Sequence, residues 1–320
     1  MNIKFHYTAV PFAKKQHALY QWWIANFAQW YKENRNEEAS GNPSPYDLIK
    51  GLLWKMRFTA TNPDSKNLWA HNGLGSGSNF TPKNLAIIKQ VSELLKDGRR
   101  IVVFSALKDE CAFLDIVLNQ AGVKSEVVNG DIPPLKQGEK VLKFQQGKLD
   151  VLICGIDAMK SGHDISEASA AVVCDFPWNS SDFRQAVKRI HRKSSKRDVD
   201  VFVVYTAASV DERMKDLVEK KGAMSDIAID GELISQDSED LDFVKILKET
   251  IELFKKSETG ADELEIEREA RKELESLGIA LAGIRNRPLP VIEGDGDETW
   301  RDIPDDILDG FLEALDREAA

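Results

Sequence analysis

Short apolar segments alternate with longer amphipathic segments over residues 100–221, and this alternation restricts the possible folds more than any other feature. The short segments have the composition of buried strands and lie at 100–105, 125–129, 150–154, 170–175 and 199–205. The longer segments have apolar residues at helical spacing and lie at 108–120, 134–146, 181–191 and 211–221. Strands that alternate with helices favour a parallel sheet with helices on both faces. We therefore predict an α/β fold with a doubly wound sheet, because parallel crossovers are right-handed.

The first 80 residues follow a different pattern, in which a long helix precedes a polar break. Ile3, Phe5 and Tyr7 alternate with other residues and lead into a segment whose apolar residues share one helix face. Those residues are Leu19, Trp23, Phe27 and Trp30. We expect this face to pack against a neighbouring element, and an aromatic platform for nucleic-acid bases is the alternative. A short helical stretch at 48–58 follows the polar residues 36–47.

A glycine-rich stretch at residues 73–78 precedes a clear helix start at Thr81 and Pro82. The stretch lacks the Gly-Lys-Ser/Thr that a phosphate loop places at the start of a helix, so we interpret it as a connector. Thr81 is a good N-cap residue, and Pro82 suits the first helical turn. We expect this helix to run to about Lys96.

Charge is divided unevenly along the chain. The net charge is −10, but residues 231–320 carry 26 acidic and 11 basic side chains, which leaves a net charge of +5 for residues 1–230. A mildly basic body can meet a polyanion, whereas an acidic tail would repel one. We predict three parts, namely a helical segment with a connector at 1–80, the α/β domain at 81–230, and an acidic, helical and partly disordered tail at 231–320.

Cysteine spacing and hydropathy exclude several classes of protein. Cys111, Cys154 and Cys174 lie 43 and 20 residues apart in apolar segments, a spacing that fits neither a zinc ribbon nor a disulfide framework. We expect three buried thiols, a reducing and therefore cytoplasmic location, and no metal site. No apolar run reaches the roughly 18 residues that span a bilayer, and the first thirty residues do not resemble a secretory signal. We expect no membrane partner.

The helical segment that follows the strand at 170–175 contains a pair of arginines suited to phosphate. Arg189 and Arg192 are three residues apart and share a helix face. In doubly wound sheets the functional groups lie beyond the carboxyl ends of the strands. Two guanidinium groups placed there would offer a fork of hydrogen-bond donors to a phosphate. The alternative is a solvated basic face, because several lysines surround the pair.

An ordered series of motifs makes residues 1–225 resemble the second RecA-like lobe of superfamily-two helicases, specifically the Swi/Snf-related DNA translocases. The sixth motif of that family, Gln-Ala-x-x-Arg-x-x-Arg, is matched by Gln185, Ala186, Arg189 and Arg192. The other similar segments are Phe104-Ser105, Gly162 to Ile165, Asp175 to Ser180, LLWKMRFTATNP at 52–63 and FHYTAVPFAKKQHALY at 5–20. The resemblance implies a RecA-like parallel sheet with helices on both faces, preceded by an inter-lobe helical segment and followed by the acidic helical tail.

The sequence departs from the family pattern within several motifs. Ala106 stands where the family has glutamine, and the arginine expected after the strand that ends near Gly130 falls at about Gln137. His163 and Asp164 replace a leucine and an asparagine. These departures concern details of DNA contact.

The resemblance also implies a role for individual residues. Arg189 and Arg192 would be arginine fingers for the γ-phosphate of ATP, with Gln185 close by. Gly162 and Asp164 would lie at the nucleotide cleft and couple it to DNA. The residues expected near the DNA backbone are Ser105, Gly130 and Trp178. For Gly130 and Gly162 the alternative is a turn that needs a positive φ, and for Trp178 it is packing in the core.

The phosphate loop Gly-x-x-x-x-Gly-Lys-Ser/Thr and the Asp-Glu box of the family's first lobe are absent from the sequence. We therefore expect a separate first-lobe chain to supply both, to hold Mg²⁺ and to share ATP with this chain, which would hydrolyse nothing alone. One hypothesis is thus half of a split DNA-dependent ATPase, and the alternative is a catalytically inactive DNA- or partner-binding module. The third possibility is that the sequence is a gene fragment. The acidic tail would screen the basic body or dock a partner, or else it is a solubilising appendage.

Overall fold

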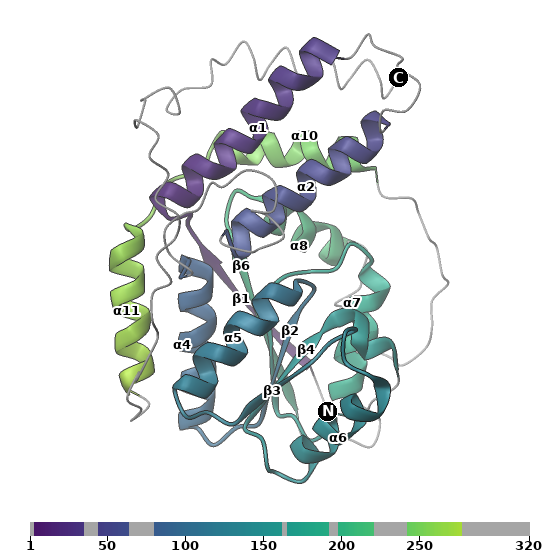
Figure 1. Ribbon diagram of the computed structural model, residues 1–320, viewed down its shortest axis with the longest axis vertical. Coiled ribbons are helices and arrows are strands. Elements are labelled where there is room, and N and C mark those ends of the chain that lie inside the picture. Colours follow the sequence, from purple (N-terminus) through teal and green to yellow (C-terminus); the bar gives the residue numbers. More distant parts are fainter. Residues whose placement is uncertain are drawn as a thin grey trace.

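Six parallel strands form one sheet at the centre of the molecule (Figure 1). The computed structural model describes residues 3–34, 44–63, 80–161, 165–191, 198–220 and 242–276. In sheet order the strands are β1 (Ile3–Val10), β6 (Val199–Thr206), β5 (Ala170–Val173), β2 (Ile101–Ser105), β4 (Val151–Gly155) and β3 (Ser125–Val128). All neighbouring pairs run parallel. The predicted parallel α/β sheet is confirmed, and each strand expected between residues 100 and 205 is present.

Helices cover both faces of the sheet, as predicted. One face carries α4 (Pro82–Lys96) and α5 (Lys108–Gln120). The other face carries α6 (Pro134–Gln145), α7 (Ser180–Ile190) and α8 (Val210–Lys220). Successive residues of a strand point to opposite faces, so the five-residue strands β2 and β4 are buried on both sides and read as continuous apolar runs. The alternation of the sequence therefore becomes a three-layer sandwich.

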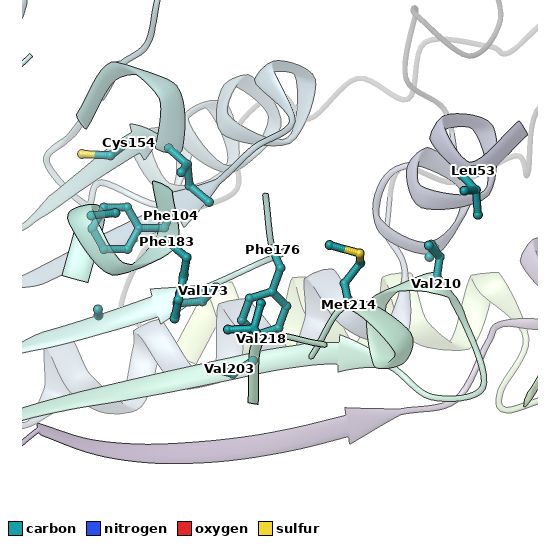
Figure 2. Packing of buried hydrophobic residues seen from close by; sticks show 14 of the residues in the cluster. Leu53, Phe104, Cys154, Val173, Phe176, Phe183, Val203, Val210, Met214 and Val218 are labelled. Atoms are coloured by element: carbon teal, nitrogen blue, oxygen red, sulfur yellow. The ribbon is translucent and has the colours of Figure 1, made fainter. Parts of the chain in front are cut away.

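The core beneath α7 and α8 is built from aliphatic and aromatic side chains. Figure 2 shows Val173 and Val203 of the sheet with Phe183 of α7 and Val218 of α8 near them. These residues are almost completely buried. Their packing fixes α7 on the sheet, and α7 carries two of the predicted site residues.

Three further helices pack together at the carboxyl edge of the sheet (Figure 1). They are α1 (Lys14–Asn34), α2 (Pro45–Thr61) and α10 (Phe243–Phe254). Within the predicted aromatic face of α1, Trp23 is buried in the core, and Leu19 and Phe27 pack partly against it. The side chain of Trp30 is 40% exposed. Packing against a neighbouring element is therefore the role of most of this face.

The chain beyond residue 240 contributes ordered helices to the same body. α11 (Glu263–Ser276) lies against α4 and forms an outer layer (Figure 1). Ile266 and Leu274 are buried at that contact, and Lys89 of α4 forms a 2.5 Å ion pair with Glu269. β1 likewise joins the sheet beside β6, although it comes from the predicted helical segment. The division into three parts stays a prediction, and residues 73–78, 221–241 and 277–320 lie outside the described residues.

The predicted start of α4 is confirmed in detail. The side-chain oxygen of Thr81 accepts a hydrogen bond of 3.1 Å from the backbone N–H of Asn84. Pro82 occupies the first helical turn, where a missing N–H costs nothing. The helix runs to Lys96, as expected.

The three cysteines are free and buried, as predicted. Burial raises the pKa of the Cys111 and Cys174 thiols well above their usual value. Both groups therefore stay protonated and behave as small apolar side chains. None of the helices that the structure describes is both long and apolar enough to cross a membrane.

Candidate functional site

Polar side chains gather where the central strands end at the carboxyl edge of the sheet. Ser105 is the last residue of β2, and Asp175 lies two residues beyond β5. Because β2 and β5 are parallel neighbours, their ends lie side by side. The Ser105 hydroxyl donates a hydrogen bond of 2.5 Å to Asp175 Oδ2, and the Ala106 N–H donates one of 2.9 Å to Asp175 Oδ1. Asp175 therefore ties the two loops together.

A buried arginine from α2 forms an ion pair with Asp175. Arg57 is 1% exposed, and its Nη2 lies 2.5 Å from Asp175 Oδ1. The same nitrogen donates to the carbonyl oxygen of Phe176. Nη1 and the indole nitrogen of Trp178 are buried without a hydrogen-bond partner among the described residues. Arg57 was not predicted as a site residue from the sequence, although its place four residues after Leu53, on the apolar side of α2, was a usable signal.

Trp178 lies in an aromatic cluster rather than on an open surface. Its ring centroid is 5.8 Å from that of Trp54 in α2 and 5.4 Å from that of Phe243 in α10. The Arg57 guanidinium lies over both tryptophans, 5.3 Å from Trp54 and 5.4 Å from Trp178. Helices α2 and α10 thus cover the predicted DNA-contacting tryptophan from two sides.

Ser105, another predicted DNA contact, is fully buried. Its hydroxyl donates to Asp175 and accepts from the Leu107 N–H at 3.0 Å, so both functions of the hydroxyl are used within the loop. The structure therefore places this residue as a support of the loop, and a direct contact with DNA stays a prediction.

Gly130 is exposed on the loop after β3. A Cβ at this position would meet no atom within 4 Å, and its φ lies outside the left-handed region. Neither crowding nor backbone conformation thus requires a glycine here. The amide of Gln137 donates to the carbonyls of Asn129 and Ile132, at 3.1 and 2.7 Å, and holds the loop on α6. Gln137 therefore has a local structural role at the position where the family has arginine.

Helix α7 carries Gln185 and Arg189. The side chain of Asn179 caps this helix by accepting a hydrogen bond of 2.9 Å from the Ser181 N–H. The apolar face of α7 is buried against the sheet, and Gln185 is exposed while Arg189 is half-buried. The Arg189 carbonyl accepts a hydrogen bond of 3.2 Å from the Ile165 N–H, which joins α7 to the segment before β5.

The structure brings Gln185 and Arg189 onto one helix, one turn apart, close to the segment that follows β4. The 3₁₀ helix η1 (Ile156–Ser161) after β4 packs against α7. The predicted site residues Gly162, Asp164 and Arg192 lie outside the described residues.

Three more buried ionisable side chains, Lys83, Asp211 and Glu110, lie near the end of α2. Lys83 Nζ is 2.6 Å from Asp211 Oδ2 and 2.8 Å from Thr61 Oγ1, and Lys83 is fully buried. Glu110 is also fully buried, and Asn62 donates a hydrogen bond of 3.3 Å to its Oε2. Burial raises the pKa of Glu110 to about 8. Glu110 is therefore largely neutral at pH 7, and sequence spacing alone gave no sign of it.

The comparisons with known proteins agree with this architecture. Residues 83–194 match the family model of the helicase conserved C-terminal domain.

The chain is similar in sequence to parts of several much longer proteins. The chain is 25% identical over 203 residues to the chromodomain-helicase-DNA-binding protein 3 homolog of Caenorhabditis elegans, a match that covers 60% of this chain and 11% of that protein. It is 29% identical over 162 residues to the SWI/SNF-related matrix-associated actin-dependent regulator of chromatin subfamily A member 1 of Mus musculus, covering 50% of this chain and 16% of that protein. The chain thus spans a small part of the length of these relatives.

The fold is that of the C-terminal domains of SWI2/SNF2 ATPases. The C-terminal part of the Fun30 ATPase domain has a TM-score of 0.58 at 15% identity, covering 79% of this chain and 97% of that one. The Sulfolobus solfataricus SWI2/SNF2 ATPase C-terminal domain has a TM-score of 0.54 at 16% identity, covering 81% and 100%. A Sulfolobus solfataricus SWI2/SNF2 ATPase core in complex with dsDNA has a TM-score of 0.58 at 16% identity, covering 81% and 51%. These likenesses establish the RecA-like fold.

Proposed function

We propose that this chain is the C-terminal helicase lobe of a Swi/Snf-like DNA-dependent ATPase, whose ATP site is completed by a first lobe on a separate chain. The observation that carries the proposal is the placement of α7. This helix starts beyond the carboxyl end of β5 and presents Gln185 and Arg189, within a RecA-like lobe. The loop that leads into α7 lies at the edge where doubly wound sheets bind ligands, and η1, which follows the carboxyl end of β4, packs against α7.

Arg189 and Arg192 would act on the γ-phosphate of ATP. An arginine is charged at every physiological pH, and its planar group can donate two parallel hydrogen bonds to phosphate oxygens. Cationic groups held in place before the reaction stabilise the charge that develops on the transferred phosphoryl group. Gln185 would orient nearby groups, and Gly162 and Asp164 would line the cleft.

The first lobe would hold the magnesium ion. The described residues contain no group of three or more His, Cys, Asp or Glu side chains that could hold a metal. The sequence has neither the phosphate loop nor the Asp-Glu box that perform this task in such motors. We therefore propose that a first-lobe chain brings both, and that this chain contributes cationic side chains.

DNA is the proposed polymeric partner. A SWI2/SNF2 core of the same fold has been solved with dsDNA. The exposed loop at Gly130 would lie near the DNA backbone, and so would Ser105 and Trp178, which follow other strands at the same edge of the sheet. Because the Ser105 hydroxyl is buried, this residue would support the contact rather than make it with its side chain.

A catalytically inactive DNA- or partner-binding module is the second candidate. The contacts that α2 and α10 make with Trp178 favour it, because a tryptophan packed between two helices suits a stable scaffold. In either case we place the protein in the reducing cytoplasm, since its three thiols are free and buried.

Co-expression with a candidate first-lobe chain tests the proposal. The complex should hydrolyse ATP and should do so faster with DNA, whereas each chain alone should be inactive. DNA-stimulated ATP hydrolysis by this chain alone, lost on Arg189→Ala, would refute the split site. A complex that forms but hydrolyses no ATP would instead support the binding module.

A further inference from the structure

We propose that Arg57 is a positioning residue, which holds the loop 175–179 and thereby the start of α7 in place from the end of α2. The effect of this positioning on ATP turnover rests on the proposed function. The contacts by which Arg57 holds the loop lie within this chain and do not depend on that function.

Arg57 contacts the loop at two successive residues. Its Nη2 pairs with Asp175 Oδ1 at 2.5 Å and also donates to the Phe176 carbonyl. Among the described residues, this is the one side-chain hydrogen bond made to residues 176–178. The pair is almost completely buried, with side chains 1% and 0% exposed, so water cannot replace either contact.

A cation–π contact adds a third point of contact. The guanidinium carbon lies 5.3 Å from the ring centroid of Trp54 on its own helix and 5.4 Å from that of Trp178 in the loop. Arginine suits this place better than lysine does, because it combines a planar donor fork with an aromatic-stacking surface. The loop is therefore held at Asp175, at Phe176 and at Trp178 by one side chain.

The loop in turn sets the first turn of α7. Asn179 ends the loop and caps the helix, and Phe176 packs against Phe183 of α7 with ring centroids 5.2 Å apart. Arg57 is thus separated from the helix that bears Gln185 and Arg189 by one short, tightly bonded segment. A shift of α2 would move the start of α7, because buried interfaces transmit displacement.

The chain offers a matched control in a second buried ion pair. Lys83 and Asp211 are as deeply buried as Arg57 and Asp175, and their contact also involves the end of α2 through Thr61. Among the described residues, neither forms a hydrogen bond or an ion pair with the loop 175–179. Removal of this pair should change global stability without changing the loop.

Hydrogen–deuterium exchange of the purified chain tests the positioning role. The double variant Arg57→Met/Asp175→Asn removes both charges together, so no buried charge is left unpaired. We expect amide exchange over residues 176–184 to rise about tenfold while strands β4 and β6 keep wild-type rates. The control Lys83→Met/Asp211→Asn should leave exchange at 176–184 unchanged. Arg57→Lys keeps the charge but not the fork, and a rise of about threefold is expected there.

Exchange at 176–184 within twofold of wild type, in a folded double variant or in folded Arg57→Lys, would overturn the inference. An equal rise in the Lys83→Met/Asp211→Asn control would overturn it as well. If the double variant does not fold, amide exchange at residues 176–184 in Arg57→Lys alone tests the inference.

A second readout separates this inference from the proposed function. In an active complex with a first lobe, Arg57→Lys should lower kcat without raising the KM for ATP, because a positioning defect acts on the transition state. Unchanged kcat there would refute the catalytic part of the inference. If no complex hydrolyses ATP at all, the proposed function fails, and the exchange result still decides whether Arg57 holds the loop.

Discussion

Lys83 and Asp211 form an ion pair of 2.6 Å whose side chains are 0% and 3% exposed. The two residues are far apart in sequence and join the start of α4 to the start of α8. Thr61 at the end of α2 accepts a second hydrogen bond from the same ammonium group. This pair and the pair between Arg57 and Asp175 anchor α2 to the carboxyl edge of the sheet.

Loss of one partner of this pair should destabilise the fold strongly. Lys83→Met leaves the Asp211 carboxylate buried and uncompensated, and we expect the free energy of unfolding to fall by about 3–5 kcal/mol. Urea denaturation of the purified chain measures this. The double variant Lys83→Met/Asp211→Asn should recover most of the loss, because no charge is then left unpaired. A free energy of unfolding for Lys83→Met within about 1 kcal/mol of the wild-type value would contradict the burial of this pair.

Glu110 should make stability fall with rising pH. Its folded-state pKa of about 8 exceeds the ordinary value of 4.5, so the folded state holds a proton that the unfolded state releases. The contribution is fully present below pH 4.5 and is lost as pH rises through about 8. We expect Glu110→Gln to remove this dependence and to be more stable than wild type at pH 9 by about 1–3 kcal/mol. Denaturant titrations from pH 5 to 9 measure it, with the exposed Glu139→Gln as control.

His17 should make the stability of the fold decrease as the pH falls, which is opposite to the effect of Glu110. Burial lowers the pKa of His17 below 6.5, so the folded state binds fewer protons than the unfolded state. The stability it contributes is present above pH 6.5 and is lost as pH falls below that value. His17→Gln can keep the hydrogen bond to the Ser257 hydroxyl, which spans 2.8 Å. Its Tm should therefore fall less than that of wild type between pH 7 and 5, and parallel curves would refute the assignment.

The arginines of the α7 region should control ATP turnover in the active complex. We expect Arg192→Ala to lower turnover by about 10³-fold or more, and Arg189→Ala to lower it by a comparable factor, if these residues contact the transferred phosphoryl group. Arg184→Ala on the same helix removes the same charge and serves as control. ATPase assays with saturating DNA measure the effect. A loss below tenfold in a folded complex removes the residue concerned from the arginine-finger role.

The parallel sheet and the order of its helices were predictable from the sequence. Strands such as 101–105 and 151–155 are short apolar runs because both of their faces are covered, and helices such as α5 have a clear 3.6-residue pattern. The Thr81 cap was equally local, because it depends on residues three apart. Patterns of this kind follow from local backbone geometry and need no knowledge of distant contacts.

The joining of β1 to the sheet and the surroundings of Trp178 depended on the tertiary structure. β1 pairs with β6, which comes nearly two hundred residues later in the chain, and Trp178 meets Phe243 of α10 and Trp54 of α2. The motifs indicated Ser105 and Trp178 as functional residues. They could not show that Ser105 is hydrogen-bonded to Asp175 or that Arg57 lies against Trp178.

The sequence by itself determined the α/β class, the helix and strand order, and the arginine-bearing motif on α7. Only the tertiary structure decided which charges are buried and paired, as with Arg57 and Asp175 or Lys83 and Asp211. The physical reason is that hydrophobic periodicity is a property of neighbouring residues. The solvation of a charge depends instead on what the whole fold places around it.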